Sequence, residues 1–186
     1  MRAGLIRCVL TMVLVAAAGQ TPAWAETDCK AAYEAHLKTD LVLDYQAFDQ
    51  TQHQGFRALG DLACHAEAAD LIEAYIAHTQ AKQSSLKWHI AQLRAHSGDY
   101  AAALRYAEQS IDPEESLEKD RLRWNDYVLA TMAFLKHDKA SLLAHRAKVE
   151  ADIERHRGNG MNLRLLDAFV KYFDSSYAEA MQHIEK

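Results

Sequence analysis

The stretch Trp88-His89-Ile90-Ala91-Gln92-Leu93, followed by Gly98-Asp99-Tyr100 and Ala103-Leu104, decides the fold of this chain. Strong helix formers surround Gly98, so the stretch predicts two helices joined by a tight turn. Asp99 stands where the N-cap of the second helix should lie. Ala91 and Ala103 are small enough to let two helix backbones approach closely. A single hairpin of this kind cannot bury its apolar face, so the stretch also predicts stacked neighbours.

The pattern resembles a tetratricopeptide repeat. That family places a small residue at Ala91, glycine at Gly98, an aromatic residue at Tyr100 and alanine at Ala103. The chain departs from the family where Trp88 comes one place late and where a small residue replaces the second large aromatic. The resemblance implies an all-α fold of stacked antiparallel helical hairpins, with the first helix of each hairpin lining a concave groove.

The same frame recurs along the chain. Ala69 precedes Ala103 by the family period of 34 residues, and His137-Asp138 and Ser175-Ser176 repeat the turn after Gly98. The resemblance covers about residues 52–186 and predicts four hairpins with turns near residues 64, 98, 137 and 175. Two further helices are expected at the N-terminus. The first helices of the hairpins are expected near residues 52–63, 84–96, 118–136 and 161–173.

Local patterns refine this expectation. The acidic run Asp112-Pro113-Glu114-Glu115 predicts a helix start, because proline suits the first turn and acids suit the positive end of the helix dipole. Gly158-Asn159-Gly160 predicts a turn between helices. Asp44 and Asp49 are interpreted as helix caps or solvated charges. The strings Trp124–Leu135 and Gly158–Leu163 also resemble the C-terminal part of exported bacterial repeat proteins without an assigned activity.

Residues 1–25 predict a cleavable signal peptide. Arg2 and Arg7 form a cationic start, Val9–Ala18 is almost wholly apolar, and Ala23 and Ala25 satisfy the small-x-small rule for cleavage after Ala25. The apolar run is about half the length of a membrane-spanning helix. We therefore expect a periplasmic or secreted protein with one domain over residues 26–186 and no membrane anchor after cleavage; the alternative is an uncleaved anchor.

Charge and cysteine content indicate which partners and which covalent links to expect. Removing residues 1–25 changes the net charge from −5 to −7, because two arginines and no acids are lost. An acidic chain repels phosphate backbones, so nucleic acid is not an expected partner. Two cysteines then remain, Cys29 and Cys64, and an even pair in an exported chain predicts one disulfide. Two free buried thiols are the alternative.

No catalytic, metal or cofactor motif is expected. His89 and His96 share a helix face, but seven residues span about 10 Å, too far for one ion. His65-Ala66-Glu67 lacks the downstream cysteines that a zinc deaminase site requires. There is no Gly-x-Ser-x-Gly nucleophile motif and no phosphate-binding glycine loop. The sequence therefore predicts a protein that is not an enzyme.

The expected activity is protein binding in the concave groove, to a peptide or partner protein of the cell envelope. Amphipathic aromatic and amide side chains on the predicted first helices are typical anchors for such partners. The alternatives are a small inhibitor or immunity-type protein that neutralises a toxin or enzyme, and an unrecognised enzyme. The candidate groove residues are Trp88, His89, Gln92, Trp124, Asn125, Tyr127, Asn159 and Asn162.

Overall fold

In the computed structural model, residues 28–184 are described, and the predicted signal peptide lies outside them. These residues form helices and no strand, which confirms the all-α prediction. None of these helices is both long and apolar enough to cross a bilayer. In chain order they are α1 (Cys29–Thr39), η1 (Asp40–Val42), the π-helix η2 (Gln46–Gln50), α2 (Phe56–Asp61), α3 (His65–Thr79), α4 (Ser84–His96), α5 (Tyr100–Glu108), α6 (Trp124–Leu135), α7 (Lys139–Ala151), η3 (Ile153–Arg155), α8 (Arg157–Lys171) and α9 (Tyr177–Gln182).

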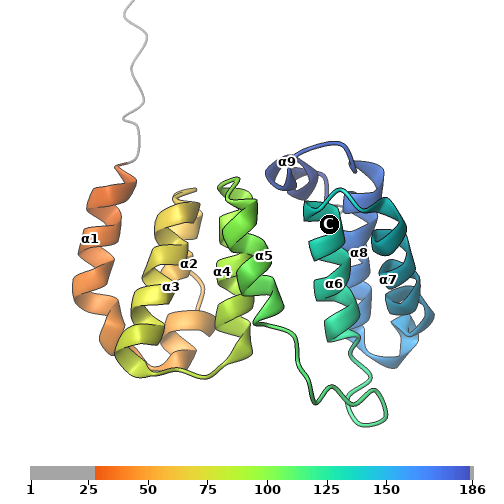
Figure 1. The fold of residues 1–186 in the computed structure, drawn as a ribbon. Helices are drawn as coiled ribbons and strands as arrows, with labels where there is room; N and C mark the ends of the chain where they lie inside the picture. Colours follow the sequence, from red (N-terminus) through yellow and green to blue (C-terminus); the bar gives the residue numbers. More distant parts are fainter. Residues whose placement is uncertain (1–27, 185–186) are drawn as a thin grey trace, which may run out of the picture.

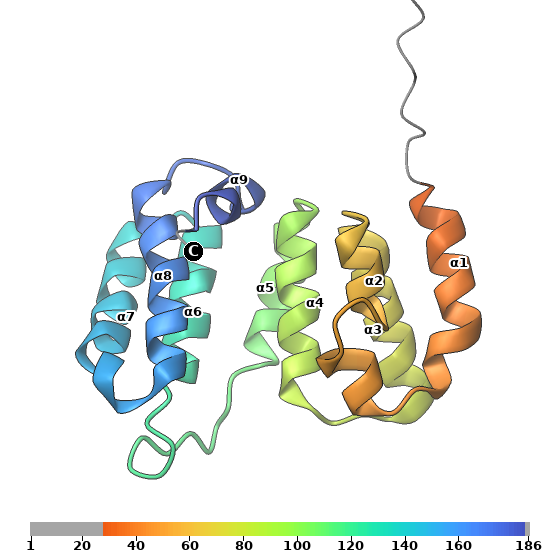
Figure 2. The same ribbon diagram turned by 180° about the vertical axis from the view of Figure 1, so that it is seen from behind.

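Helices α1–α5 form one group and α6–α9 a second, with α8 in contact with both α6 and α7 (Figure 1). The pairs α2–α3, α4–α5, α6–α7 and α8–α9 are in contact, and α3–α4, α5–α6 and α7–α8 join one pair to the next. The connections within the pairs fall at the four predicted turns. A long loop over residues 109–123 separates α1–α5 from α6–α9, and α9 reaches back to contact α4 (Figures 1 and 2).

Three of the turns share one backbone conformation. Ala63, Gly98 and His137 have φ values of 60°, 83° and 55°, the left-handed conformation that commonly ends a helix. The N-cap of the following helix comes next in each case. The side chains of Asp99 and Asp138 accept hydrogen bonds from the amides of Ala102 and Ser141, as the sequence predicted.

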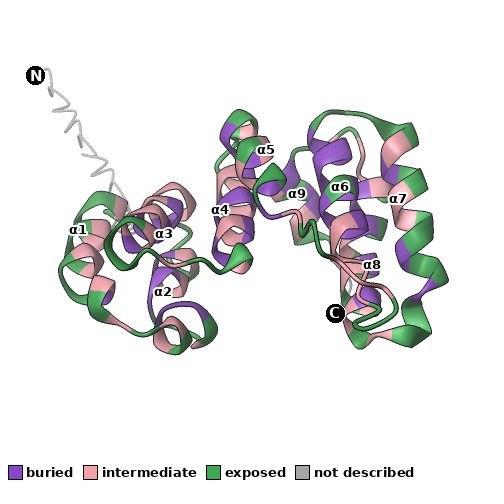
Figure 3. Cartoon of the chain, turned by 60° about the horizontal axis from the view of Figure 1, so that its bottom comes forward, coloured by how far each residue is buried: buried purple, intermediate pink, exposed green. Residues whose placement is uncertain are grey.

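The apolar side chains form two cores. Figure 3 marks the buried residues along the helices of both groups. The N-terminal core contains Phe48, Leu59, Leu71 and Tyr75, and the C-terminal core contains Phe134, Leu142, Phe169 and Tyr177. Helix α4 serves both, because Leu86 and Ile90 lie in the first, whereas Trp88, Ala91 and Ala95 lie in the second. The small residues Ala91 and Ala103 are buried as expected.

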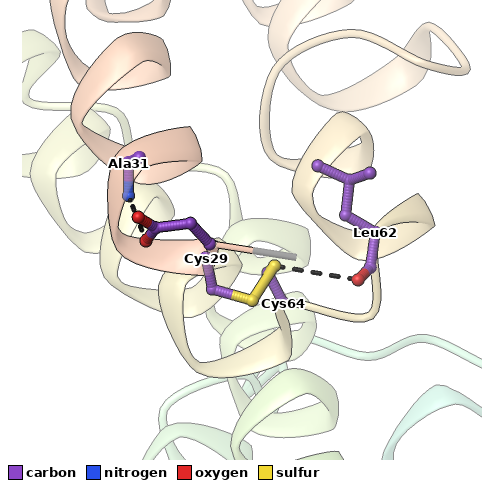
Figure 4. Close-up of a disulfide and its surroundings, with 5 residues drawn as sticks. Cys29, Ala31, Leu62 and Cys64 are labelled. Carbon is purple, nitrogen blue, oxygen red and sulfur yellow. Dashed lines mark hydrogen bonds between the residues drawn. A yellow bond between two sulfur atoms is a disulfide. The ribbon is translucent and has the colours of Figure 1, made fainter. Parts of the chain in front are cut away.

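The predicted disulfide is present. Cys29 at the start of α1 is bonded to Cys64 before α3, with 5.4 Å between their Cα atoms (Figure 4). Helix α1 contains no buried residue, so its apolar contacts with the N-terminal core are only partial. The covalent bond therefore fixes a helix that side-chain burial holds weakly.

Two local predictions are wrong. No helix starts at Asp112–Glu115; this segment lies in the loop, and the next helix begins at Trp124 rather than near residue 118. The acidic run still serves a helix N-terminus, because the Glu115 carboxylate accepts a hydrogen bond from the amide of Asn125 in the first turn of α6. Gly158-Asn159-Gly160 is the first turn of α8, not a turn between helices. A Cβ atom at Gly158 would lie 2.9 Å from side-chain atoms of His156 and Leu122, so a larger residue there would require these side chains to shift.

Candidate functional site

A pocket of about 270 Å³ lies where α2, α4 and α9 meet. Helix α4 contributes side chains at i, i+3, i+4 and i+7, a spacing that places them on one helix face. These are His89, Gln92, Leu93 and His96. The remaining lining residues are Phe56, Arg57, Gly60 and Asp61 of α2, His65 of α3, and Tyr177 and Met181 of α9. Most of the pocket wall is thus formed by α2 and α4, the first helices of two pairs, and closed by α9.

A buried carboxylate lies behind this wall. Asp49, in η2, has no exposed surface, and its Oδ1 atom is 3.1 Å from His89 Nε2 and 3.6 Å from the Arg57 guanidinium. The His89 contact is an ion-pair contact without an aligned hydrogen bond. Burial raises the pKa of Asp49, but hydrogen bonds and the charge of His89 outweigh it, so the pKa lies below its ordinary value. The prediction of a helix cap or solvated charge is therefore wrong for Asp49. Asp44 does act as a cap, because its carboxylate accepts a hydrogen bond from the amide of Ala47.

The network continues into the pocket. His89 Nδ1 lies 3.3 Å from Gln92 Oε1, and the Gln92 amide donates to the hydroxyl of Tyr127 at 3.5 Å. Both ring nitrogens of His89 therefore face protein groups. This arrangement holds the imidazole and the amide in fixed orientations at the pocket wall, which suits recognition by a pre-formed surface.

Three rings from three helices form the wall near α9. The imidazoles of His65 and His96 are stacked with centroids 4.5 Å apart, and the His96 and Tyr177 rings are nearly perpendicular with centroids 5.2 Å apart. No protein group among residues 28–184 hydrogen-bonds the buried Nδ1 atom of His65. Burial lowers the pKa of both histidines, and the neighbouring His65 contributes to lowering the pKa of His96 to about 4. Both rings are thus neutral near pH 7.

The candidate groove residues separate into distinct environments. His89 and Gln92 line the pocket. Trp88 and Tyr127 are buried in the C-terminal core, where their rings meet edge to face at 5.1 Å. Trp124 is partly buried and donates its indole N–H to the carbonyl of Ser110. These three aromatic side chains therefore pack the molecule instead of lining the pocket.

The candidate asparagines hold the long loop. Asn125 pairs with both the amide and the carbonyl of Asp112, at 2.8 and 2.7 Å. Asn159 is fully buried; its Oδ1 accepts from the amide of Arg123, and its Nδ2 donates to the carbonyls of Arg121 and Asp152. Within residues 28–184, the side chain of Asn162 makes none of the hydrogen bonds found in the structure. The amides of Asn125 and Asn159 thus satisfy backbone groups of the long loop, and Asn159 also satisfies the carbonyl of Asp152 just after α7.

The pocket lining contains imidazoles but no aliphatic hydroxyl or thiol. It contains no serine, threonine or cysteine that the Asp49–His89 pair would activate. In the described part of the chain, three His, Cys, Asp or Glu donors converge only at Cys29, Cys64 and Glu67, and the two sulfurs there are bonded to each other. A metal-ligating histidine usually donates its other N–H to an oriented partner, and His65 lacks one.

Sequence reasoning missed most of the pocket, including Phe56, Arg57, His65, His96 and Tyr177. One signal was present. Successive helices run antiparallel, so the first residue of α3 lies beside the last residue of α4, and these residues are His65 and His96. The contribution of α9 has no local signal, because more than 70 residues separate Tyr177 from α4.

Comparison with family models, curated proteins and solved structures finds no match to this chain.

Proposed function

We propose that this chain is an exported, tetratricopeptide-like binding module, and that the pocket between α2, α4 and α9 takes one side chain of a partner protein. The observation that carries the proposal is the lining of this pocket. Rings or apolar chains come from Phe56, His96, Leu93 and Met181, and a fixed polar network comes from His89 and Gln92. Interface anchors are bound in surroundings of this kind.

The size of the pocket supports a side chain as its occupant. Pockets that bury drug-sized ligands measure about 300 to 1,000 Å³. At about 270 Å³ this pocket lies just below that range and accommodates a single large side chain or a comparably small molecule. A peptide segment, or a helix of another envelope protein, would present such an anchor while its backbone crosses the surface of α2 and α4.

Methionine adds adaptability to the α9 side of the pocket. Met181 is unbranched and polarisable, so it adjusts to ligands of different shape and makes favourable contacts with aromatic rings. The guanidinium of Arg57 lies 4.9 Å from the centroid of the Phe56 ring and leaves a cationic group at the pocket. The preferred anchor is therefore apolar or aromatic, with a hydrogen-bond acceptor close to it.

Gly60 allows a direct test. It lines the pocket, and a Cβ atom added there meets nothing within 4 Å. The substitution Gly60→Phe should therefore fill the pocket without disturbing the fold. Photo-crosslinking from Leu93 in periplasmic extracts would identify the partner segment, and the corresponding synthetic peptide would be titrated against purified variants. A partner that is a toxin or enzyme would assign the module to the inhibitor class.

We expect Gly60→Phe to weaken peptide binding by about tenfold or more, as loss of a central anchor does. The matched control is Leu143→Phe, which adds a ring on the partly exposed face of α7, away from the pocket. Equal peptide affinity for Gly60→Phe and the parent protein would refute the pocket as the binding site.

A further inference from the structure

The imidazoles of His65 and His96 form the joint at which α9 meets the N-terminal half. His96 ends α4, His65 begins α3, and Tyr177 begins α9 (Figures 1 and 2). The His65 and His96 rings are stacked, and the Tyr177 ring meets His96 edge-on at 83°. The contacts α4–α9 and α5–α6 link the helices on the two sides of the long loop.

This joint is built for neutral rings. His65 and His96 take part in no ion pair found among residues 28–184, so neither has a carboxylate to compensate a positive charge. A charge on one ring would be partly desolvated, and a second would lie within 5 Å of it. Both effects oppose protonation while the rings remain stacked, and they agree with the lowered pKa of each histidine.

The charged groups that line the pocket beside the joint already have partners. Around the joint, α2 contributes Arg57 and Asp61, and α4 contributes His89. Asp61 is paired with His53 at 2.7 Å, and His89 and Arg57 face Asp49. The α9 residues that lie beside His65 and His96 are uncharged. They are Tyr177, Ala178, Met181 and Gln182. Glu179, the acid of α9, lines a separate surface with Lys139 and Phe173, so none of the α9 residues beside the histidine pair is an acid.

We propose that the His65–His96 pair makes the α4–α9 contact acid-sensitive, so that protonation of one ring loosens α9 and removes one wall of the pocket. The same event would release an anchored side chain, a consequence that rests on the proposed function. Binding of an apolar anchor against neutral rings would in turn oppose protonation, since linkage between the two equilibria is reciprocal.

Amide hydrogen exchange of the ligand-free protein tests the proposal. We expect protection of residues 177–182, corrected for intrinsic exchange, to fall at least about tenfold between about pH 7 and about pH 4.5 relative to α6. The variant His96→Phe keeps a ring in the stack, removes one titratable group and removes the repulsion between two charged rings, so the fall in α9 protection should become clearly smaller, with His65 as the remaining titratable ring. The control His78→Phe, at an exposed position near the end of α3, should behave as the parent protein.

Unchanged α9 protection in the parent protein, or the same pH response in His96→Phe, would overturn the proposal. If His96→Phe does not fold, His96→Gln provides the same comparison with a neutral polar side chain. Because the measurement needs no peptide, it separates the two proposals. An acid-sensitive α9 combined with Gly60→Phe binding as tightly as the parent would retain the joint and reject the binding pocket.

Discussion

At the scale of the residue, the polar side chains that matter most are buried ones. Asp49 has no exposed surface, yet it faces His89 and Arg57 and accepts a hydrogen bond from Gln50. Buried charges are tolerated only when paired in this way. Asp49 thereby fixes the orientation of two pocket residues without lining the pocket itself.

Replacing this carboxylate should therefore destabilise the fold. We expect Asp49→Asn to lower the free energy of unfolding by about 1 to 3 kcal/mol near neutral pH. The folded pKa of Asp49 is below its ordinary value of 3.8, so its contribution is complete above that value and is lost as the pH falls through the folded pKa. The measurement is urea unfolding of both proteins at several pH values. Asp61→Asn, in an exposed pair with His53, should change stability by less than about 1 kcal/mol.

Asn159 and Asn162 form a second matched pair on α8. Asn159→Ala removes three hydrogen bonds and leaves the carbonyls of Arg121 and Asp152 without that donor, so we expect a loss of about 2 to 4 kcal/mol. Asn162→Ala removes no hydrogen bond within residues 28–184 and should be nearly neutral. Thermal and urea unfolding would measure both. Similar losses of stability for the two variants would show that the hydrogen bonds of Asn159 do not contribute the expected stability.

At the scale of the element, α1 stands out among the described α-helices because it contributes no fully buried side chain. It has no buried residue, and the Cys29–Cys64 bond closes a separation of 35 residues. A covalent link of this length restricts the unfolded chain and replaces the apolar burial that the helix lacks.

We expect the double variant Cys29→Ser/Cys64→Ser to lose about 3 to 4 kcal/mol. Amide exchange should increase most in residues 29–39, because α1 loses its covalent attachment. Addition of a reductant should destabilise the parent protein and leave the double variant unchanged, which serves as the control. Unaltered α1 protection in the double variant would contradict this role for the disulfide.

The turns of the helix pairs make a separate prediction. Ala63 occupies the left-handed position that Gly98 occupies in the next pair, and a Cβ atom there is strained. Ala63→Gly should therefore relieve this strain and stabilise the protein by about 0.5 to 1 kcal/mol. The greater entropy that glycine gives the unfolded chain reduces this gain. Ala74→Gly, in the interior of α3, should instead destabilise it by about 1 kcal/mol. Calorimetry of the two variants would check the opposite signs.

At the scale of the whole molecule, the two cores meet through few contacts. Tyr106 packs against both cores, and the backbone amide of Tyr177 donates to the hydroxyl of Tyr100 at 3.0 Å across 77 residues of sequence. These contacts and the histidine joint unite the two halves around the pocket.

Tyr100→Phe tests this connection, since it removes the acceptor and keeps the ring. We expect a loss of about 1 to 2 kcal/mol and faster amide exchange in α9. Tyr33→Phe, on the partly buried face of α1, makes no comparable contact with the C-terminal half and should leave α9 unchanged. Retained α9 protection in Tyr100→Phe would mean that burial of Tyr177 alone holds the helix.

Sequence alone determined the helical class, the four turns, the two aspartate N-caps and the disulfide. Each depends on local chemistry: helix propensity around Gly98, short polar side chains at Asp99 and Asp138, and two cysteines in a chain with a predicted signal peptide. It failed at Asp112–Glu115 and at Gly158–Gly160, where contacts with distant segments override local preference. The binding function is a proposal whether it is argued from the sequence or from the structure.

Only the tertiary structure decided the candidate site. Whether an aromatic residue packs or lines a pocket depends on the direction in which its helix face points. Helix α4 turns Trp88 into the core, His89 toward η2 and α2, and His96 toward α9. The burial of Asp49 and the meeting of His65, His96 and Tyr177 arise from helices far apart in sequence. Periodicity assigns residues to helix faces, but only packing of the whole chain decides which faces meet.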